Sequence, residues 1–158
     1  IGQGEAFPQV GQQVAYFRAA LGEAGLSYSP DRVVAARAMY TAPSLEQARR
    51  DTQGPFMWFK QTGQEVGAPP DHQVELLPEE FKEYRRRFSR EASLDYEAML
   101  QNVVLFGTPD QVAERIERLR QAGVENLIFF VNYGGIENRK VLASLELFAK
   151  DVMPRFKD

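Results

Sequence analysis

Two apolar runs of the sequence end in residues that could bind a ligand. The run 127–131 is followed directly by Asn132, Tyr133, Gly134 and Gly135. A polar side chain that ends an otherwise apolar strand needs a partner, so we expect Asn132 and Tyr133 to contact a bound molecule. The two glycines could let the backbone approach a ring or a phosphate, although a tight turn would explain them equally well.

The earlier run, 32–41, contains further candidates. Arg37 is costly inside a strand unless it is paired, and its partner would be an anionic ligand or a buried carboxylate from a neighbouring strand. Met39 and Tyr40 stand at the end of the run, where we expect them to contact a substrate. Trp58 could line an apolar cavity, or it could simply pack a helix against a sheet.

Other kinds of chemistry find little support in the sequence. His72 is the only histidine and lies between Asp71 and Gln73, with no Ser/His/Asp set and no metal-ligand spacing around it. The sequence has no phosphate loop and no Gly-x-Gly-x-x-Gly pattern. We therefore predict no metal site, and the sequence identifies no catalytic residue.

The candidates lie on repeated strand-helix units. The runs 32–41, 103–106 and 127–131 predict strands, and a helical pattern follows each of them. Thr108, Pro109 and Gln111 predict one helix start, with a capping box and a proline in the first turn. Repeated units with short loops indicate a parallel sheet, either doubly wound or closed into a barrel.

The helices are predicted from apolar spacing and from glycine or proline at their ends. Ser44 and Gln47 predict the start of the helix after the first strand, and Gly54 with Pro55 predicts a kink or break before Phe56. The remaining helices are predicted over 10–21, 109–122 and 141–152.

Length bears on the choice of fold. A complete (β/α)8 barrel needs about 250 residues, whereas this chain has 158 and begins with Ile1 rather than Met. We therefore expect residues 1–158 to form one partial domain, the C-terminal portion of a TIM-type barrel with parallel strands and outer helices. The alternative is a self-contained small α/β domain. The segment 63–93 does not fit the alternation and is predicted to be an inserted lid or a mobile loop.

Composition excludes several classes of function. A net charge of −3 and a pI near 5.3 give no electrostatic footprint for nucleic acid. No apolar run approaches the ~20 residues needed to cross a membrane. The absence of cysteine excludes disulfides and thiolate chemistry and is compatible with a cytoplasmic location.

Three segments resemble the closing part of the bacterial-luciferase-like flavin monooxygenases. They are Gly-Thr-Pro-Asp-Gln-Val-Ala-Glu-Arg-Ile at 107–116, Ala-Gly-Val at 122–124, and Ser-Leu-Glu-Leu-Phe-Ala-Lys-Asp-Val-Met-Pro at 144–154. The run Val-Ala-Ala-Arg-Ala-Met-Tyr-Thr-Ala at 34–42 also resembles a part of that family. No single motif is diagnostic, and the ordered set is what indicates the family.

The resemblance implies an oxidoreductase that uses reduced FMN and O2 to oxygenate a small organic substrate, with a related branch that uses a deazaflavin for hydride transfer. It makes one set of residues candidates for the cofactor: Arg37, Asn132, Tyr133, Gly134 and Gly135. A second set, Met39, Tyr40 and Trp58, would contact substrate. The implied partners are the substrate, O2, a flavin reductase, and either a second copy or the remainder of the barrel. The alternative to an enzyme is a non-catalytic α/β module that self-associates.

Overall fold

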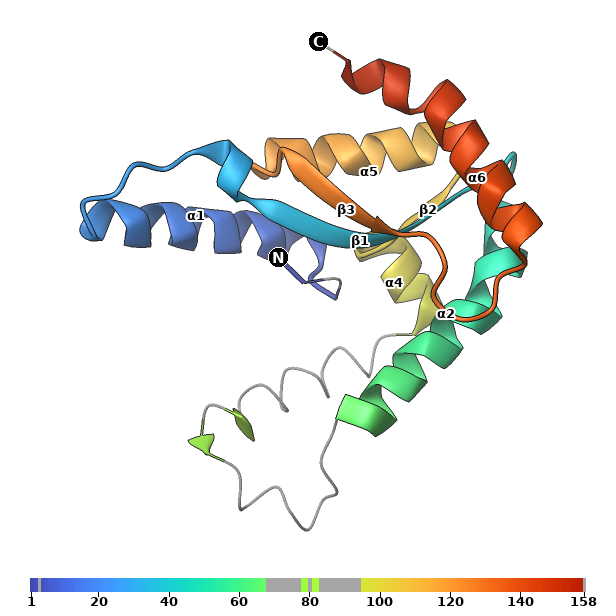
Figure 1. The fold of residues 1–158 in the computed structure, drawn as a ribbon, viewed down its shortest axis with the longest axis horizontal. Coiled ribbons are helices and arrows are strands. Elements are labelled where there is room, and N and C mark those ends of the chain that lie inside the picture. Colours follow the sequence, from blue (N-terminus) through green and yellow to red (C-terminus); the bar gives the residue numbers. More distant parts are fainter. Residues whose placement is uncertain (3, 68–77, 80, 83–94, 158) are drawn as a thin grey trace.

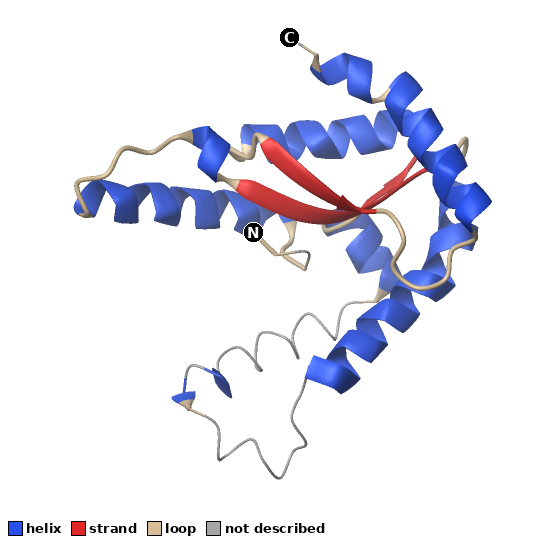
Figure 2. Ribbon diagram, in the orientation of Figure 1, coloured by secondary structure: helices blue, strands red, loops and turns tan. Residues whose placement is uncertain are grey.

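The computed structural model describes residues 1–2, 4–67, 78–79, 81–82 and 95–157. In this part of the chain a parallel sheet is flanked by helices (Figures 1 and 2). In chain order the elements are α1 (Phe7–Glu23), η1 (Pro30–Arg32), β1 (Val34–Thr41), α2 (Leu45–Gly67), α4 (Tyr96–Asn102), β2 (Leu105–Gly107), α5 (Pro109–Gln121), β3 (Asn126–Phe130), α6 (Asn138–Asp151) and η3 (Met153–Phe156). The predicted α/β class with parallel strands is confirmed.

Strand β1 lies in the middle of the sheet, whose order is β2-β1-β3. Its first half, Val34–Ala38, pairs with β3, and its last residues, Met39–Thr41, pair with β2. The chain therefore passes from one side of β1 to the other between β2 and β3. In open parallel sheets, a crevice for ligands forms at the carboxyl end of the strands where the connections switch sides.

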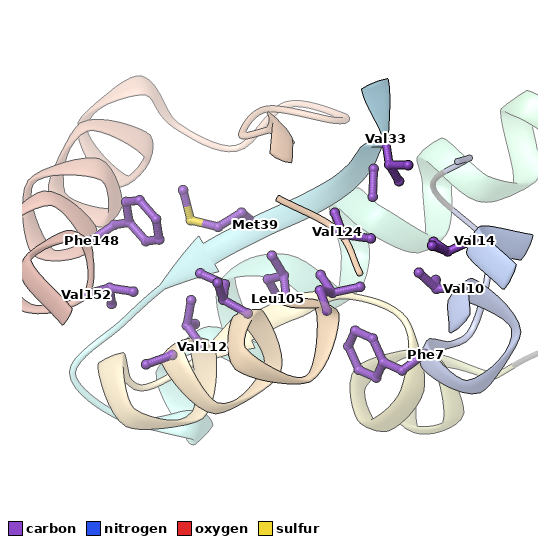
Figure 3. Packing of buried hydrophobic residues seen from close by; sticks show 14 residues of the cluster. Phe7, Val10, Val14, Val33, Met39, Leu105, Val112, Val124, Phe148 and Val152 are labelled. Atoms are coloured by element: carbon purple, nitrogen blue, oxygen red, sulfur yellow. The ribbon is translucent and has the colours of Figure 1, made fainter. Parts of the chain in front are cut away.

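The core has two parts, one on each face of β1. Met39 and Leu105 belong to a cluster with apolar residues of α1, α5 and α6 (Figure 3). Tyr40 and Phe106 belong to the other cluster, with residues of α2 and α4. Strands covered on both faces are apolar almost throughout, which is why the sequence of β1 shows no alternation.

The start of α5 follows the predicted capping box. The Thr108 hydroxyl accepts from the main-chain N–H of Gln111, and the Gln111 side chain accepts from the N–H of Thr108. Helix α4 was not expected from the apolar pattern. It starts at Asp95, whose side chain accepts from the N–H of Ala98 at 2.7 Å.

Of the kink or break expected at Gly54 and Pro55, the break was wrong, because α2 continues through both residues as one helix; the kink stays a prediction. Proline removes one hydrogen bond from a helix interior and normally disfavours it. Here Phe56 lies edge-on to Phe106 and Tyr133, with ring centroids 5.3 and 5.4 Å apart. This buried aromatic packing holds the second half of α2 against the core and outweighs the local preference.

The predicted insertion at 63–93 falls largely outside the described residues, as does His72. Its first residues, up to Gly67, continue α2. Among the helices of the described ranges, none is long and apolar enough to cross a membrane. The Asp and Glu side chains described in the structure form no group of three that could hold a metal ion.

Candidate ligand-binding site

A pocket of about 580 Å³ opens at the carboxyl end of β1, in the crevice expected from the sheet topology. It lies between the end of β1, the start of α2 and one side of α6. We call it the strand-end pocket; its lining residues are Tyr40, Thr41, Pro43, Gln47, Arg139, Lys140, Ala143, Ser144, Glu146, Leu147 and Lys150. Its volume falls in the range of pockets that bind small molecules.

Local structure explains how α2 and α6 meet the end of β1. Strand β3 pairs with β1 only as far as Ala38, so the main-chain N–H of Thr41 has no strand partner on that side. It donates instead to the Ser144 hydroxyl on α6 at 2.7 Å. Helix α2 begins just after Pro43, where the Ser44 hydroxyl accepts from the N–H of Gln47 at 3.1 Å.

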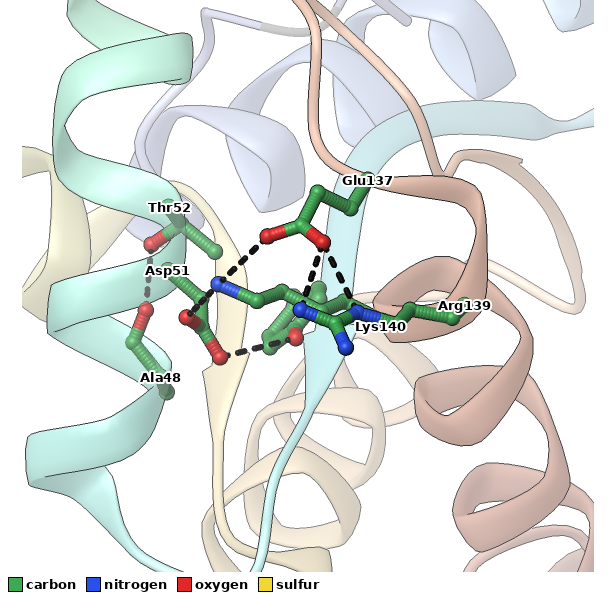
Figure 4. A network of polar contacts seen from close by, with 7 residues as sticks. Ala48, Asp51, Thr52, Glu137, Arg139 and Lys140 are labelled. Atoms are coloured by element: carbon green, nitrogen blue, oxygen red, sulfur yellow. Dashed lines mark hydrogen bonds and ion pairs between the residues drawn. The ribbon is translucent and has the colours of Figure 1, made fainter.

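A polar network around the buried Asp51 shares Tyr40, Arg139 and Lys140 with the lining of the pocket (Figure 4). The Tyr40 hydroxyl donates to Asp51 Oδ2 at 3.1 Å, and Lys140 Nζ donates to Asp51 Oδ1 at 2.7 Å. The Asp51 side chain is only 6% exposed, whereas Lys140 is 36% exposed. Asp51 therefore joins β1, α2 and α6 through one carboxylate.

The network shifts the pKa values of its members. Burial raises the pKa of the Tyr40 phenol, and the hydrogen bond to the Asp51 carboxylate raises it further. Burial alone would raise the pKa of Asp51, but hydrogen bonds from Lys140 and Tyr40 leave it below its usual value. The hydrogen bond to Asp51 raises the pKa of Lys140. At neutral pH the phenol is neutral, and the carboxylate and ammonium are charged.

The cations that line the pocket have different partners. Arg139 and Lys140 both contact Glu137, at 2.7 and 3.5 Å, so part of their charge is already balanced. Lys150 is exposed on α6 and Glu146 is the acidic side chain in the lining. Together with the hydroxyls of Tyr40, Thr41 and Ser144 and the apolar Ala143 and Leu147, this lining suits a small molecule that has one polar or anionic end.

Tyr133, one of the residues predicted from the sequence, is buried, with 3% of its surface exposed. Its ring stacks on Phe106, with centroids 5.4 Å apart, and lies edge-on to Phe56. Its hydroxyl is buried and has no hydrogen-bond partner among the described residues. Burial raises the pKa of Tyr133 well above its ordinary value. In this structure Tyr133 belongs to the core and does not line the strand-end pocket.

The neighbouring residues lie over α2. Asn132 and Gly135 are exposed. Gly134 has a φ of +148°, and a Cβ atom there would lie 2.6 Å from the carbonyl oxygen of Pro55 and 2.7 Å from the Trp58 ring. The glycine thus allows close packing of the loop on α2. Trp58 is 58% exposed and does not line the strand-end pocket.

Arg37 and Met39 point to the other face of β1. The Arg37 guanidinium is fully buried and donates to the main-chain carbonyls of Gly2 at 2.7 Å and Glu5 at 3.1 Å. Burial lowers its pKa to about 10. Its described partners also include the carbonyl of Ala36 on its own strand, at 2.7 Å, and its predicted contact with an anionic ligand or a carboxylate stays a prediction. Met39 lies in the core beside α5 and α6.

The structure brings together residues that the sequence did not single out. Asp51 comes from α2, whereas Lys140 and Ser144 come from α6, and no motif joins the two segments. One signal was available: Asp51 and Thr52 stand between Ala48 and Phe56 at helical spacing, so a carboxylate and a hydroxyl share the apolar side of a helix. A carboxylate in that position requires buried partners.

Comparison with known proteins identifies the family. The family model described as luciferase-like monooxygenase matches residues 1–126. The chain therefore belongs to the luciferase-like monooxygenase family. The match ends before residues 144–154, one of the segments on which the resemblance was based. A search among curated protein sequences gave no match.

Three solved structures are similar in fold. The monooxygenase RslO1 from Streptomyces bottropensis is 18% identical, with a TM-score of 0.58, over 99% of this chain and 41% of that one. The oxygenating constituent of 3,6-diketocamphane monooxygenase from Pseudomonas putida, in complex with FMN, is 21% identical, with a TM-score of 0.59, over 96% and 41%. The coenzyme F420-dependent tetrahydromethanopterin reductase from Methanopyrus kandleri is 22% identical, with a TM-score of 0.59, over 96% and 43%. The chain thus spans less than half the length of each structure, as expected for a portion of a luciferase-like fold.

Proposed function

We propose that this chain is part of a flavin-dependent monooxygenase that uses reduced FMN and O2 to oxygenate a small organic substrate. The observation that supports this most directly is a ligand-sized pocket at the carboxyl end of β1, in a chain of the luciferase-like monooxygenase family. The diketocamphane monooxygenase component, which has a similar fold, was solved with FMN. In this proposal a flavin reductase supplies the reduced cofactor.

The residues of the strand-end pocket fit the phosphate end of FMN. Lys150 and Arg139 are cationic, and Pro43 and Gln47, at the start of α2, also line the pocket. Helix N-termini and basic side chains together suit a phosphate group. Bound reduced FMN would supply the electrons that activate O2.

The chain's own residues would hold and orient the ligand. In this proposal Lys150 and Arg139 balance its negative charge, and the apolar side of α6 at Ala143 and Leu147 excludes water from the less polar end. Met39, Tyr40 and Trp58 were predicted from the sequence to contact substrate, and of these three Tyr40 lines the pocket. Its phenol donates a hydrogen bond to Asp51, so in this proposal Tyr40 would contact the ligand without releasing a proton. The site roles of the other residues predicted from sequence remain predictions.

A second candidate is a hydride-transfer enzyme that uses a deazaflavin. The fold likeness to the F420-dependent reductase favours this second candidate. The pocket that a deazaflavin needs is similar to the pocket that FMN needs. Titration with both cofactors separates the two candidates.

The test is anaerobic titration of the chain with FMN, riboflavin and F420, followed by absorbance and fluorescence. We expect saturable FMN binding that Lys150→Gln weakens about fivefold to tenfold, or about 1–1.4 kcal/mol. Riboflavin lacks the phosphate, so its affinity should not respond to this substitution. Lys157→Gln removes a lysine outside the strand-end pocket and is the matched control. The proposal would be contradicted if the unchanged chain, Lys150→Gln and Lys157→Gln all bound FMN with the same affinity. A folded chain that binds none of the three ligands would also contradict it.

A further inference from the structure

The Ser144 hydroxyl on α6 has a proton whose acceptor is not found among the described residues. Its oxygen accepts from the main-chain N–H of Thr41 at 2.7 Å, and this is the one hydrogen bond of the side chain in the described structure. A hydroxyl also has a proton to donate. Ser144 is only 4% exposed and lines the strand-end pocket. A buried polar group needs a partner, so the pocket is where we expect the acceptor to bind.

Another buried hydroxyl shows the usual arrangement on a helix. The Thr52 hydroxyl, on α2, donates to the main-chain carbonyl of Ala48, one turn earlier, at 2.8 Å. Serine and threonine inside helices commonly bond the carbonyl four residues back. For Ser144 that carbonyl belongs to Lys140, and the described part of the structure shows no such bond. The Ser144 hydroxyl is therefore held by β1 and not by its own helix.

The pairing of the strands explains this contact. The N–H of Ala42 donates to the carbonyl of Gly107, at the end of β2, at 2.9 Å. Because main-chain groups alternate in direction along a strand, the N–H of Thr41 points to the opposite side of β1. On that side β3 pairs only as far as Ala38, and α6 lies beside the end of β1 (Figure 1). The strand thus fixes the oxygen of Ser144 and leaves its proton for a ligand.

The lining around Ser144 favours an anionic acceptor. Arg139, Lys140 and Lys150 line the same pocket, and Glu146 is the acid among the lining residues. A neutral hydroxyl can donate to an anion without adding a charge to a buried position. A hydrogen bond to a charged group is also stronger than one between neutral groups. A phosphate oxygen is therefore the acceptor that suits this hydroxyl best.

We propose that Ser144 is a binding residue of the strand-end pocket and donates a hydrogen bond to an oxygen of a bound phosphate group. The N–H of Thr41, the hydroxyl and the phosphate then form one chain of hydrogen bonds, and the bonds in such a chain strengthen one another. That the phosphate belongs to FMN rests on the proposed function, whereas the contact with phosphate can be tested without a flavin.

The first test is anaerobic titration of Ser144→Ala with FMN and riboflavin. We expect its affinity for FMN to fall at least about tenfold, because a hydrogen bond to a charged group is lost. Riboflavin has a neutral hydroxyl in place of the phosphate, so its affinity should fall less than about threefold. A loss of stability alone would not separate the two ligands in this way.

Two further variants control this test. Ser144→Thr keeps the hydroxyl and should restore FMN binding. Thr52→Val removes a buried helix hydroxyl that is outside the lining of the pocket, so it should lower stability and leave both affinities unchanged. Circular dichroism confirms that each variant is folded.

The second test uses inorganic phosphate and no flavin. The amide proton of Thr41 is followed by nuclear magnetic resonance while phosphate is added to the isotope-labelled chain. A phosphate that accepts from Ser144 makes the hydroxyl oxygen a stronger acceptor, so the Thr41 amide signal should move downfield. Sodium chloride at the same ionic strength should not move this signal, and phosphate should not move it in Ser144→Ala.

The outcomes separate this inference from the proposed function. A downfield shift with phosphate, in a chain that does not bind FMN, would contradict the proposed function and support the contact of Ser144 with phosphate. Unchanged FMN affinity in Ser144→Ala, or a Thr41 signal that does not respond to phosphate, would overturn the inference even where the unchanged chain binds FMN. A folded chain that binds neither phosphate nor FMN would overturn both.

Discussion

Replacing Asp51 with asparagine should destabilise the chain, because this carboxylate joins three elements. The substitution keeps the shape of the side chain and removes the charge that Lys140 and Tyr40 bind at 2.7 and 3.1 Å. Loss of a buried, charge-assisted hydrogen bond costs about 1.5–3 kcal/mol. Water can reach the Lys140 ammonium, and Glu137 lies 3.5 Å from it, so we place the cost of Asp51→Asn at the lower end, about 1–2 kcal/mol.

The cost should depend on pH at both ends of the range. The folded-state pKa of Asp51 is below its ordinary 3.8, so its contribution is complete above the unfolded pKa and is lost as the pH falls through the folded pKa. The folded-state pKa of Lys140 is above its ordinary 10.5, so its contribution is complete below the unfolded pKa and is lost as the pH rises through the folded pKa. The difference between wild type and Asp51→Asn should therefore be largest between about pH 5 and 9.

Urea denaturation followed by tryptophan fluorescence, at constant m, gives the free energy of unfolding at each pH. In thermal unfolding the same change should lower the Tm by about 2–8 °C. Lys140→Met and the double variant complete a cycle, and we expect the double variant to be less destabilised than the sum of the two single variants. Strict additivity, or an Asp51→Asn cost that is unchanged at pH 3, would refute the assigned ion pair.

Two further predictions concern the turn after β3 and the buried hydroxyls. Gly134→Ala should destabilise the chain by about 2–3 kcal/mol, because its Cβ would meet α2 at 2.6 Å, whereas Gly135→Ala, where φ is +85° and the space is open, should cost about 1 kcal/mol. Equal costs in urea denaturation would show that backbone conformation alone requires the glycines. Tyr133→Phe removes a hydroxyl without a described partner and should change stability by less than about 0.5 kcal/mol, or increase it. Tyr96→Phe removes a hydrogen bond to Thr52 and should cost about 1 kcal/mol. A larger cost for Tyr133→Phe than for Tyr96→Phe would show that the Tyr133 hydroxyl has a partner, such as a bound water.

The sequence alone predicted the fold class and part of the local structure. The capping box at Thr108 and Gln111 predicted the start of α5 to the residue, because a cap depends only on groups within one helical turn. The three apolar runs predicted the three strands, since burial on both faces of a sheet leaves a continuous apolar signal. The ordered motifs also indicated the family that the comparison with known proteins then showed.

Other local expectations failed where packing opposed them. Pro55 did not end α2, because Phe56 is held between Phe106 and Tyr133. Proline acts on its own helical turn, whereas the aromatic contacts join residues that are distant in sequence. Propensity is a weak prior wherever tertiary contacts of this size are present.

The sequence thus predicted the three strands, the helices other than α4, and the family, since these depend on periodicity and on ordered motifs. The tertiary structure decided which residues meet at the carboxyl end of β1. Asp51, Lys140 and Ser144 gather there because α2 and α6 both meet the end of β1, where β3 pairs only as far as Ala38 and leaves the Thr41 N–H free to bind Ser144 on α6. Strand order depends on pairing between segments that are distant in sequence, and no local pattern specifies it.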